Sequence, residues 1–330
     1  MRYRYLGETG VQVSSLCMGT MTFGREADKA TSAALYKRCR SAGINFFDCA
    51  DVYANGDSER ILGGLIAGNR DEVIITSKVF GQIGTDRNAR GNSRRHIMTA
   101  VEASLRRLNT DHIDVYFLHG FDAYTPLEES LRALDDLVSQ GKVLYPGASN
   151  FAAWQVMKAL GLSTREGWSR FKVIQPMYNL VKRQAEVELL PLAQSERLGV
   201  ISYSPLGGGL LTGKYKPDAP PVGRIAENQN YARRYGDDWM HQAALDFAGL
   251  ADAHGLKPAA LAVAWVAVHP GITAPIIGAR NLEQLEESLG ALTVPMTSEL
   301  YAEITHLTPQ PVPATDRTEE TRPQVRLQAW

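Results

Sequence analysis

Four side chains able to transfer or orient a proton stand at or just after three short apolar runs of the sequence. Asp48, Lys78 and His119 each end one of these runs, and Tyr53 follows shortly after Asp48. In a barrel of parallel strands, residues at the carboxyl ends of the strands meet at one rim. The spacing therefore predicts that the four side chains lie together.

These four side-chain types suit the reduction of a carbonyl group. A hydride must reach the carbon, and a proton must reach the oxygen as negative charge builds there. A tyrosine hydroxyl has a pKa of about 10 in water, and we expect the ammonium of Lys78 to lower the pKa of Tyr53 while Asp48 keeps that lysine charged. His119 can donate a hydrogen bond that aims the oxygen at Tyr53. Each residue alone could be structural, but their joint placement favours catalysis.

Short apolar runs alternate with helical patterns along most of the chain, as in repeated βα units around a parallel sheet. Eight of these runs lack strict polar alternation and resemble buried parallel strands. They are residues 14–19, 44–48, 73–78, 113–119, 143–149, 171–175, 200–204 and 272–278. The sequence therefore predicts the α/β class and a (β/α)8 TIM barrel.

Residues with strong capping preferences precede three of the helical patterns. They are Ser93, Thr125 with Pro126, and Asn281. The first 13 residues, MRYRYLGETGVQV, have a turn between two strand-like runs and predict an N-terminal β-hairpin that caps the barrel.

Two segments depart from the alternation. Residues 212–240, after the seventh strand, are rich in Pro, Gly, Asn and charge, and predict a long functional loop such as a lid. Residues 308–330 predict a mobile terminus or an extra substrate loop. Since linker-like stretches fall only where barrel loops are expected, we predict one domain over 1–330, with 309–330 as a flexible tail.

Composition and charge exclude several other classes of protein. The chain has 330 residues, of which 44% are hydrophobic and 22% charged, and a formal net charge of -1, which indicates neither nucleic acid nor membrane as a partner. Its longest apolar stretch, residues 259–268, is too short to span a bilayer and predicts a buried helix. The start has no apolar segment typical of a secretory signal. Three cysteines without metal-ligand spacing, at positions 17, 39 and 49, suit a reducing compartment, so we expect a cytoplasmic protein.

Several motifs resemble those of the aldo-keto reductase family, in the family's order, from the first residues to about residue 290. They are LGETGVQVSSLCMGTMTFG, INFFDCADVYANGDSERILG, IITSK, DVYFLHGFD, GASNF, QPMYNLVKRQAEVELLP and ISYSPLGGGLLTGKY. The resemblance implies that Asp48, Tyr53, Lys78 and His119 form the catalytic tetrad, with Tyr53 as the general acid. It also implies a nicotinamide cofactor that lies extended across the barrel rim.

The resemblance assigns further residues to the cofactor. Ser149, Asn150 and Gln175 match residues that hold the nicotinamide carboxamide, and Tyr203 matches the ring that stacks on the nicotinamide. Ser204, Leu206 and Gly207 match the pyrophosphate side. The full expected cofactor set is Gly19, Thr20, Met21, Asp48, Ser149, Asn150, Gln175, Tyr203, Ser204, Pro205, Leu206, Gly207, Gly209, Leu210, Lys214, Ile277, Gly278, Ala279, Arg280, Gln284, Glu287 and Ser288.

The last βα turn, PIIGARNLEQLEES, has a physical interpretation of its own. A strand that turns through Gly278 into a helix starting near Asn281 presents free backbone N–H groups to a phosphate. Arg280 can then bind a 2′-phosphate, which favours NADPH/NADP+ over NADH. The resemblance points the same way through Gln284, but this chain has Gly278 where some branches carry lysine, and Ser288 where most carry asparagine.

The substrate is expected to be a small-molecule carbonyl compound. Loop residues after the strands predict a pocket with an aromatic bias, made of Met21, Phe23, Tyr53, Phe80, His119, Phe121 and Tyr124 together with unspecified parts of 212–240. A sugar aldehyde, a small aliphatic aldehyde and a bulky ketone all remain open. The sequence predicts neither the physiological direction nor the oligomeric state.

Other chemistries find less support. Tyr178 and Lys182 have the Y-x-x-x-K spacing of short-chain dehydrogenases but follow a strand end without a G-x-G-x-x-G. The triple glycine 207–209 lacks the GK[ST] of a P-loop, and no HExxH indicates a metal, so no metal is expected. An isomerase or aldolase would need a phosphate grip or a Schiff-base lysine. A nucleotide-binding interaction subunit with little turnover, like the β subunits of potassium channels in this family, remains the alternative.

Overall fold

A computed structural model describes residues 1–215, 223–319 and 325–328. Its centre is a closed barrel of eight parallel strands, in which β10 pairs with both β3 and β9. The strands are β3 (Cys17–Gly19), β4 (Phe46–Asp48), β5 (Ile74–Val79), β6 (Ile113–Leu118), β7 (Val143–Ser149), β8 (Val173–Gln175), β9 (Gly199–Ser202) and β10 (Ala274–Ile277). The predicted (β/α)8 barrel is confirmed.

The strand register brings the predicted site to one end of the barrel. Gly19 is opposite Asp48, Asp48 is opposite Thr76, and Ser149 is opposite Gln175. Several strands are shorter than the apolar runs. Ser204, for example, lies beyond the end of β9 and adopts a left-handed φ of 60° in the turn that follows. At other strands the apolar run begins before the strand, at residues such as Leu16 and Ile44 that are buried without strand pairing.

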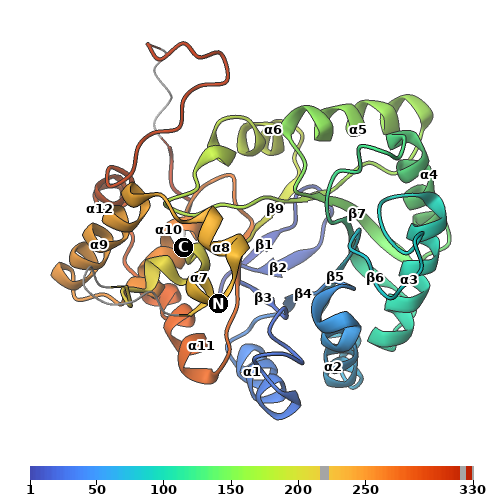
Figure 1. The fold of residues 1–330 in the computed structure, drawn as a ribbon, viewed down its shortest axis with the longest axis horizontal. Helices are drawn as coiled ribbons and strands as arrows, with labels where there is room; N and C mark the ends of the chain where they lie inside the picture. Colours follow the sequence, from blue (N-terminus) through green and yellow to red (C-terminus); the bar gives the residue numbers. More distant parts are fainter. Residues whose placement is uncertain (216–222, 320–324, 329–330) are drawn as a thin grey trace.

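Helices surround the barrel and cover the outer faces of its strands (Figure 1). The α-helices are α1 (Lys29–Ser41), α2 (Asp57–Ile66), α3 (Arg94–Leu108), α4 (Leu127–Ser139), α5 (Ala153–Glu166), α6 (Leu189–Ser195), α7 (Arg224–Glu227), α8 (Gln229–Arg234), α9 (Asp238–Ala253), α10 (Pro258–Ala267), α11 (Leu282–Leu289) and α12 (Ser298–Thr305). Short 3-10 helices are η1 (Tyr53–Gly56), η2 (Arg70–Glu72), η3 (Gln184–Glu186), η4 (Gly207–Thr212) and η5 (Gly290–Thr293).

The predicted helix starts are met at two of three positions. The side chains of Ser93 and Asn281 accept backbone N–H groups at the starts of α3 and α11. Thr125 does not cap α4, whose N-cap is Pro126; its hydroxyl donates instead to Asp122. Asp122 also accepts the backbone N–H groups of Asn92 and Tyr124, so it organises the loop before α4 and binds the Thr125 hydroxyl there.

The core has an inner and an outer layer, because successive strand residues point to opposite faces. Phe46 belongs to the cluster inside the barrel with Val115 and Phe117, whereas Phe47 packs outside the barrel under the helices. The apolar α10 lies wholly in the outer layer, as the sequence predicted, and Trp265 is its largest buried side chain. In the described ranges no helix is both long and apolar enough to cross a membrane.

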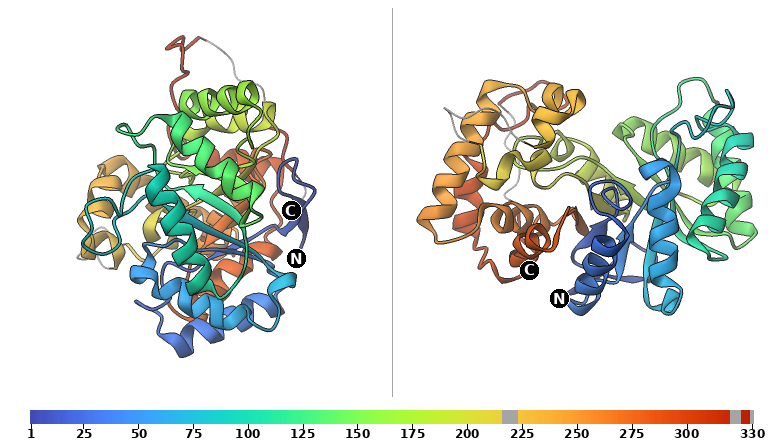
Figure 2. Two further views of the ribbon diagram at one scale, coloured as in Figure 1. Left: turned by 90° about the vertical axis from the view of Figure 1, so that its right-hand side faces the viewer. Right: turned by 60° about the horizontal axis from the view of Figure 1, so that its bottom comes forward.

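The predicted N-terminal hairpin is confirmed as β1 (Tyr3–Tyr5) and β2 (Gln12–Ser14), paired antiparallel. It lies at one end of the barrel (Figure 2), and Leu6 from its turn belongs to the inner core. Gly7 has a φ of 60°, and a Cβ there would lie 2.4 Å from the backbone nitrogen of Gly199, so only glycine fits. The hairpin thereby closes the end of the barrel opposite the site.

The long segment after β9 is more ordered than a plain loop. Within the predicted range 212–240 it holds α7, α8 and the start of α9, while residues 216–222 lie outside the described residues. These helices lie over the barrel on the face shown in Figure 1. Helices as short as α7 and α8 leave little hydrophobic periodicity in the sequence. For this reason the polar composition of the segment predicted a loop.

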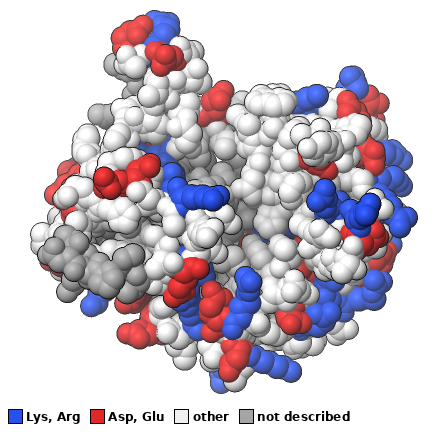
Figure 3. Space-filling view, viewed as in Figure 1, with Lys and Arg blue, Asp and Glu red and all other residues white. Residues whose placement is uncertain are grey.

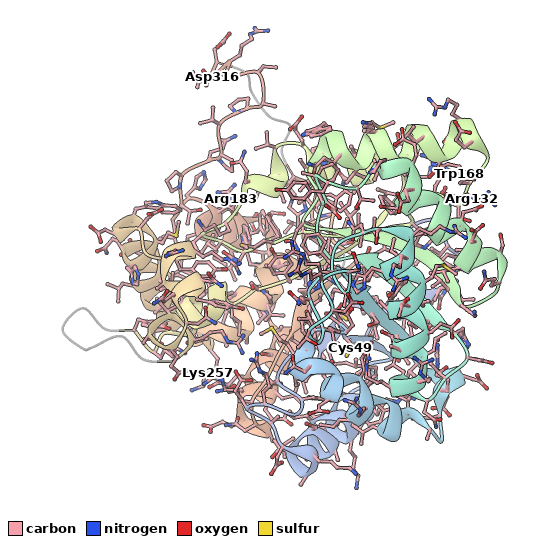
Figure 4. All side chains as sticks on the ribbon, turned by 45° about the vertical axis from the view of Figure 1, so that its right-hand side comes forward. Cys49, Arg132, Trp168, Arg183, Lys257 and Asp316 are labelled. Atoms are coloured by element: carbon pink, nitrogen blue, oxygen red, sulfur yellow. The ribbon has the colours of Figure 1, made fainter. Side chains whose placement is uncertain are left out.

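The C-terminal segment divides into two described parts. Asp316 lies at an extension that stands away from the barrel (Figure 4). Gln328 returns to the body, where its side-chain amide donates to the carbonyls of Ala267, His269 and Ile272, at 2.7–2.9 Å. Arg4 of the hairpin donates to two of the same carbonyls. Residues 325–328 therefore lie at the hairpin end of the barrel and do not form the substrate loop that was one of two interpretations of 308–330; residues 320–324 and 329–330 lie outside the described residues.

Candidate active site

Lys78 joins the predicted catalytic side chains into one cluster. Its Nζ lies 2.7 Å from Asp48 Oδ2, 2.7 Å from the carbonyl oxygen of Cys49 and 3.2 Å from Tyr53 Oη. The lysine is 0% exposed, so these contacts replace water around its charge. The His119 ring meets the Tyr53 ring edge-on, with centroids 6.1 Å apart. The structure thus brings together all four side chains that the strand ends predicted.

Asp48 is held on both oxygens. Thr76 Oγ1 donates to Asp48 Oδ1 at 2.6 Å, and Gln175 Nε2 donates to the same oxygen at 2.8 Å. With Lys78 on the other oxygen, the carboxylate has little freedom to turn. Gln175, expected from the resemblance to contact a cofactor, also orients Asp48.

The protonation of the cluster differs from expectation at Tyr53. Burial raises the pKa of Tyr53 to about 12 even though the Lys78 ammonium lowers it, so the expected net decrease is wrong for this structure. Burial also acts to lower the pKa of Lys78, but Asp48 and Tyr53 outweigh it and raise that pKa above its ordinary value. Burial, with a smaller contribution from Lys78, lowers the pKa of His119 to about 3. At neutral pH the site therefore holds an ammonium, a protonated tyrosine and a neutral imidazole.

The turn that carries Tyr53 is strained. Ala54 and Asn55, directly after it, have φ values of 48° and 52°, in the left-handed region that non-glycine residues seldom adopt. Lys78 Nζ lies 4.8 Å from the centroid of the Tyr53 ring, where its charge interacts favourably with the ring face. The contacts of Tyr53 with Lys78 offset the conformational cost of this left-handed backbone.

A cavity of about 750 Å³ opens above the cluster at the carboxyl ends of the strands. The space-filling view shows a hollow near the centre of this face, with acidic and basic side chains gathered beside it over α1 and α11 (Figure 3). The predicted residues that line the cavity are Gly19, Met21, Asp48, Tyr53, His119, Ser149, Asn150, Gln175, Tyr203, Ser204, Pro205, Leu206, Gly209, Lys214, Gly278, Ala279, Arg280, Gln284 and Glu287. One cavity thus reaches from the reactive cluster to the start of α11.

Other predicted cofactor residues lie behind the lining. They are Thr20, Gly207, Leu210, Ile277 and Ser288, all buried. Thr20, for example, donates to the Asp48 carbonyl oxygen, and Ser288 donates to that of Gln284. These residues shape the walls of the cavity from behind.

Four of the residues predicted to form the substrate pocket do not line the cavity. Phe23 is 0% exposed and packs in the outer core, because the chain after β3 turns back at Thr20. Phe121 packs edge-on against Phe151, and Phe80 lies against Gly120. Tyr124 is 97% exposed. The predicted aromatic pocket is therefore reduced to Met21, Tyr53 and His119, with Tyr203 beside them.

The ends of β7 and β9 are joined across the cavity. The Tyr203 hydroxyl donates to Asn150 Oδ1 at 2.7 Å, and Asn150 Nδ2 donates to the His119 carbonyl oxygen at 2.8 Å. Asn150 has a left-handed φ of 57° and Ser204 one of 60°. These bonds give Tyr203 a fixed position on one wall, where a planar ring could stack against it.

Several cations line the part of the cavity near α11, where acidic side chains accompany them. Lys214, Arg224 and Arg280 all line it, and burial, then the charges of Arg280 and Arg224, lower the pKa of Lys214. Glu227 lies 3.3 Å from Arg280, and Glu26 lies 3.4 Å from Arg224. Cations clustered in this way, one of them a lysine with a lowered pKa, suit a site for an anion such as a phosphate.

The start of α11 offers fewer free N–H groups than predicted. The Asn281 side chain accepts the N–H of Gln284, and the Gln284 side-chain oxygen accepts the N–H of Arg280. The helix caps itself with side chains, so at this end the Arg280 guanidinium is a stronger anion ligand than the backbone.

Sequence reasoning missed several residues that complete the site. Thr76 lies two residues before Lys78 on β5, and strand alternation alone could have placed it on the same face. The helices after β9 contribute Arg224, Tyr231 and Arg234 to the lining. Both arginines lie over the Tyr231 ring, at 5.4 and 5.2 Å from its centroid. No one-dimensional signal selects these three within a segment that lacks periodicity.

The Y-x-x-x-K spacing has a structural role. Tyr178 is wholly buried, stacks on Trp265 and donates to Glu186 at 2.8 Å. Lys182 lies over the ring of Tyr235. Neither residue lines the cavity, in agreement with the interpretation that the spacing is coincidental.

Comparisons with known proteins show which protein family the chain resembles. The model of the family described as aldo/keto reductase matches residues 15–308. An uncharacterised oxidoreductase of Bacillus subtilis (strain 168), YrpG, is 37% identical over 324 residues, 94% of this chain and 97% of that protein. A probable voltage-gated potassium channel subunit beta of Arabidopsis thaliana is 37% identical and covers 89% and 92%. A norsolorinic acid reductase of Aspergillus flavus is 34% identical and covers 89% and 78%.

Proposed function

Because this chain belongs to the aldo/keto reductase family, we propose that it reduces an aldehyde or ketone to the alcohol with a nicotinamide dinucleotide as hydride donor, and that it prefers NADPH to NADH. The observation that carries the proposal is the contact of one buried ammonium, Lys78, with both Asp48 and Tyr53 beneath the cavity. A protonated tyrosine beside a buried ammonium suits the protonation of an oxygen on which negative charge develops.

The cluster can deliver a proton to a developing alkoxide. Tyr53 is protonated at neutral pH and lies at the cavity wall, so its hydroxyl can donate to a carbonyl oxygen. The tyrosinate left behind is stabilised by Lys78, 3.2 Å away, which Asp48 keeps charged. The neutral His119 imidazole can donate a second hydrogen bond to the same oxygen and orient the substrate.

The cavity fits a dinucleotide in both its size and its donors. Its lining reaches from the tetrad to α11 and includes four cationic side chains, while Tyr203 and Asn150 flank the reactive end. Bound there, NADPH would supply the hydride. Ser149, Asn150 and Gln175 would hold its carboxamide, Tyr203 would stack on the nicotinamide, and Arg280 would bind the 2′-phosphate.

A second candidate function comes from the similarity to proteins named as potassium channel β subunits. Under this alternative the chain binds a dinucleotide and acts as an interaction partner, with little turnover. The complete tetrad of Asp48, Tyr53, Lys78 and His119 favours the reductase, since an interaction partner needs no buried proton donor.

The deciding experiment titrates the purified protein with NADPH and with NADH, followed by nicotinamide fluorescence. A panel of aldehydes and ketones is then added, and nicotinamide absorbance is followed with wild type and with Tyr53→Phe. Binding of NADPH with turnover lost in the variant would support the reductase. Binding without turnover of any carbonyl would favour the interaction subunit, and absence of binding would contradict both.

A further inference from the structure

A second buried acid lies directly behind the catalytic cluster. Asp51 belongs to the turn between β4 and Tyr53 and is 0% exposed. Neither of its side-chain oxygens has a hydrogen-bond partner within the described part of the chain, and the same holds for the hydroxyl of Tyr116, also 0% exposed. Buried polar atoms without partners are rare, so such a site needs an explanation.

The neighbouring acid, Glu59 on α2, is fully satisfied. Ser77 Oγ donates to Glu59 Oε1 at 2.6 Å, and Arg107 Nε donates to Glu59 Oε2 at 2.6 Å. Arg107, on α3, also donates to Ser104. Glu59 is 0% exposed, and Arg107 is the cation that pairs with it.

This arrangement leaves Asp51 without a cation of its own. The groups that face it are Glu59 from α2, Arg107 from α3, Tyr116 from β6 and Lys78 from β5. Arg107 is engaged by Glu59, and Lys78 is engaged by Asp48. An ionised carboxylate with no partner in a buried site is strongly destabilising. Of the two acids, Asp51 is therefore the one that keeps its proton.

The electrostatics agree with this assignment. Burial, followed by the charge of Glu59, raises the pKa of Asp51 to about 7, although Arg107, the nearby backbone N–H of Val52 and Lys78 lower it. The acid is thus neutral below this pH. It ionises near neutral pH.

Asp51 sits in the turn that places the reactive groups. Its N–H donates to the carbonyl of Lys78, while the carbonyl of Cys49 accepts the Lys78 ammonium at 2.7 Å. The N–H of Tyr53 donates to the carbonyl of Ala50. Asp51 therefore belongs to the same bonded turn that sets Tyr53 near Lys78.

We propose that Asp51 is a titratable positioning residue: while its carboxyl group is neutral, the turn that sets Tyr53 beside Lys78 keeps its geometry, and loss of the proton loosens this turn. Ionisation places a second negative charge beside Glu59 with one arginine between them. The repulsion and the desolvation both push Asp51 towards water. The effect on turnover rests on the proposed reductase function, while the effect on folding does not.

The test compares pH profiles of kcat and KM at saturating NADPH for wild type and Asp51→Asn. Asparagine reproduces the neutral acid in shape and cannot ionise. We expect wild-type kcat to fall several-fold as the pH rises through about 7, with KM unchanged. In Asp51→Asn we expect kcat to stay at the low-pH value. The control Asp57→Asn, at an exposed acid of the same loop and helix, should keep the wild-type profile.

A second variant keeps the test decisive if Asp51→Asn does not fold. Glu59→Gln removes the like charge and frees Arg107 to pair with Asp51, so its profile should also lack the fall above about pH 7. The proposal is overturned if Asp51→Asn or Glu59→Gln keeps the wild-type pH dependence. It is equally overturned if Asp51→Asn loses turnover at every pH, because an ionised carboxylate would then be required.

Thermal unfolding separates this proposal from the reductase function. The folded pKa of Asp51 is raised, so its stabilising contribution is present at low pH and lost as the pH rises from about 4, the unfolded value, to about 7. The Tm of wild type should therefore fall relative to that of Asp51→Asn across this window. A constant difference in Tm would contradict the neutral acid, whether or not any carbonyl is turned over.

Discussion

The guanidinium of Arg280 lies 3.3 Å from the carboxylate of Glu227, so that the short helix α7 is tied to the turn after β10 across the part of the cavity near α11. Under the proposed function a 2′-phosphate binds the same guanidinium. The carboxylate then competes with the cofactor for its principal ligand.

Glu227→Gln should therefore tighten NADPH binding. The pair is partly exposed, with 31% and 60% of the two side chains accessible, and exposed ion pairs are worth about 0.2–1 kcal/mol. We expect the Kd for NADPH to fall by up to about fivefold and the Kd for NADH to stay unchanged. Fluorescence titration measures both constants. Glu303→Gln, at an exposed acid paired with His254, is the matched control. An equal change in Kd in that variant would show that Glu227 does not compete with the cofactor for Arg280.

Arg280→Ala should weaken NADPH binding and spare NADH. A hydrogen bond to a charged group contributes about 1.5–3 kcal/mol, which corresponds to roughly a 10- to 150-fold rise in the Kd for NADPH. NADH has no 2′-phosphate and should lose little affinity. The same titration checks this, with Arg60→Ala on α2 as a control for an exposed arginine. Equal losses for both cofactors would make Arg280 a structural residue.

Tyr53→Phe should lose most of kcat and keep its cofactor. General acid catalysis contributes about 10²- to 10⁴-fold, and phenylalanine preserves the ring that Lys78 supports. Stopped-flow or steady-state absorbance measures kcat, and fluorescence measures the Kd for NADPH. Tyr124→Phe, which removes a hydroxyl from a side chain that is 97% exposed, should behave as wild type. Turnover close to normal in Tyr53→Phe would assign the proton to another group.

His119 should couple stability to acid. Burial lowers its folded pKa to about 3, below the unfolded value of about 6.5. A histidine kept neutral by folding contributes stability above the unfolded pKa, and this contribution is lost as the pH falls from about 6.5 towards about 3. Against His119→Asn, the free energy of unfolding of wild type should fall by up to about 1.4 kcal/mol per pH unit in this window. Denaturant titrations at several pH values measure it, and parallel curves for the two proteins would show that His119 is not buried neutral.

Much of the fold was predictable because it rests on local patterns. Buried parallel strands read as continuous apolar runs, and helix starts carry capping residues such as Ser93 and Asn281. The barrel end at which the site lies follows from topology once the strands are known. The positions of Asp48, Lys78 and His119 at predicted strand ends were therefore enough to place their side chains at one rim of the barrel.

The errors arose where contacts between distant segments decide the outcome. Phe23 and Phe121 follow strands as expected, but their loops turn back into apolar clusters, so neither ring reaches the cavity. The short helices after β9 place Arg224 and Arg234 over the cavity without any periodic signal in the sequence. Loop paths depend on contacts with distant segments, and local sequence patterns do not reveal these contacts.

The sequence by itself determined the barrel, the rim that holds the site and the four side chains that meet there, because strand periodicity and strand ends are local properties. Tertiary structure alone decided how these side chains are charged. Lys78 meets Asp48 in a buried site, Tyr53 keeps its proton, and Asp51 is left beside Glu59 without a cation. Burial sets the cost of each charge, and burial is a property of the whole fold.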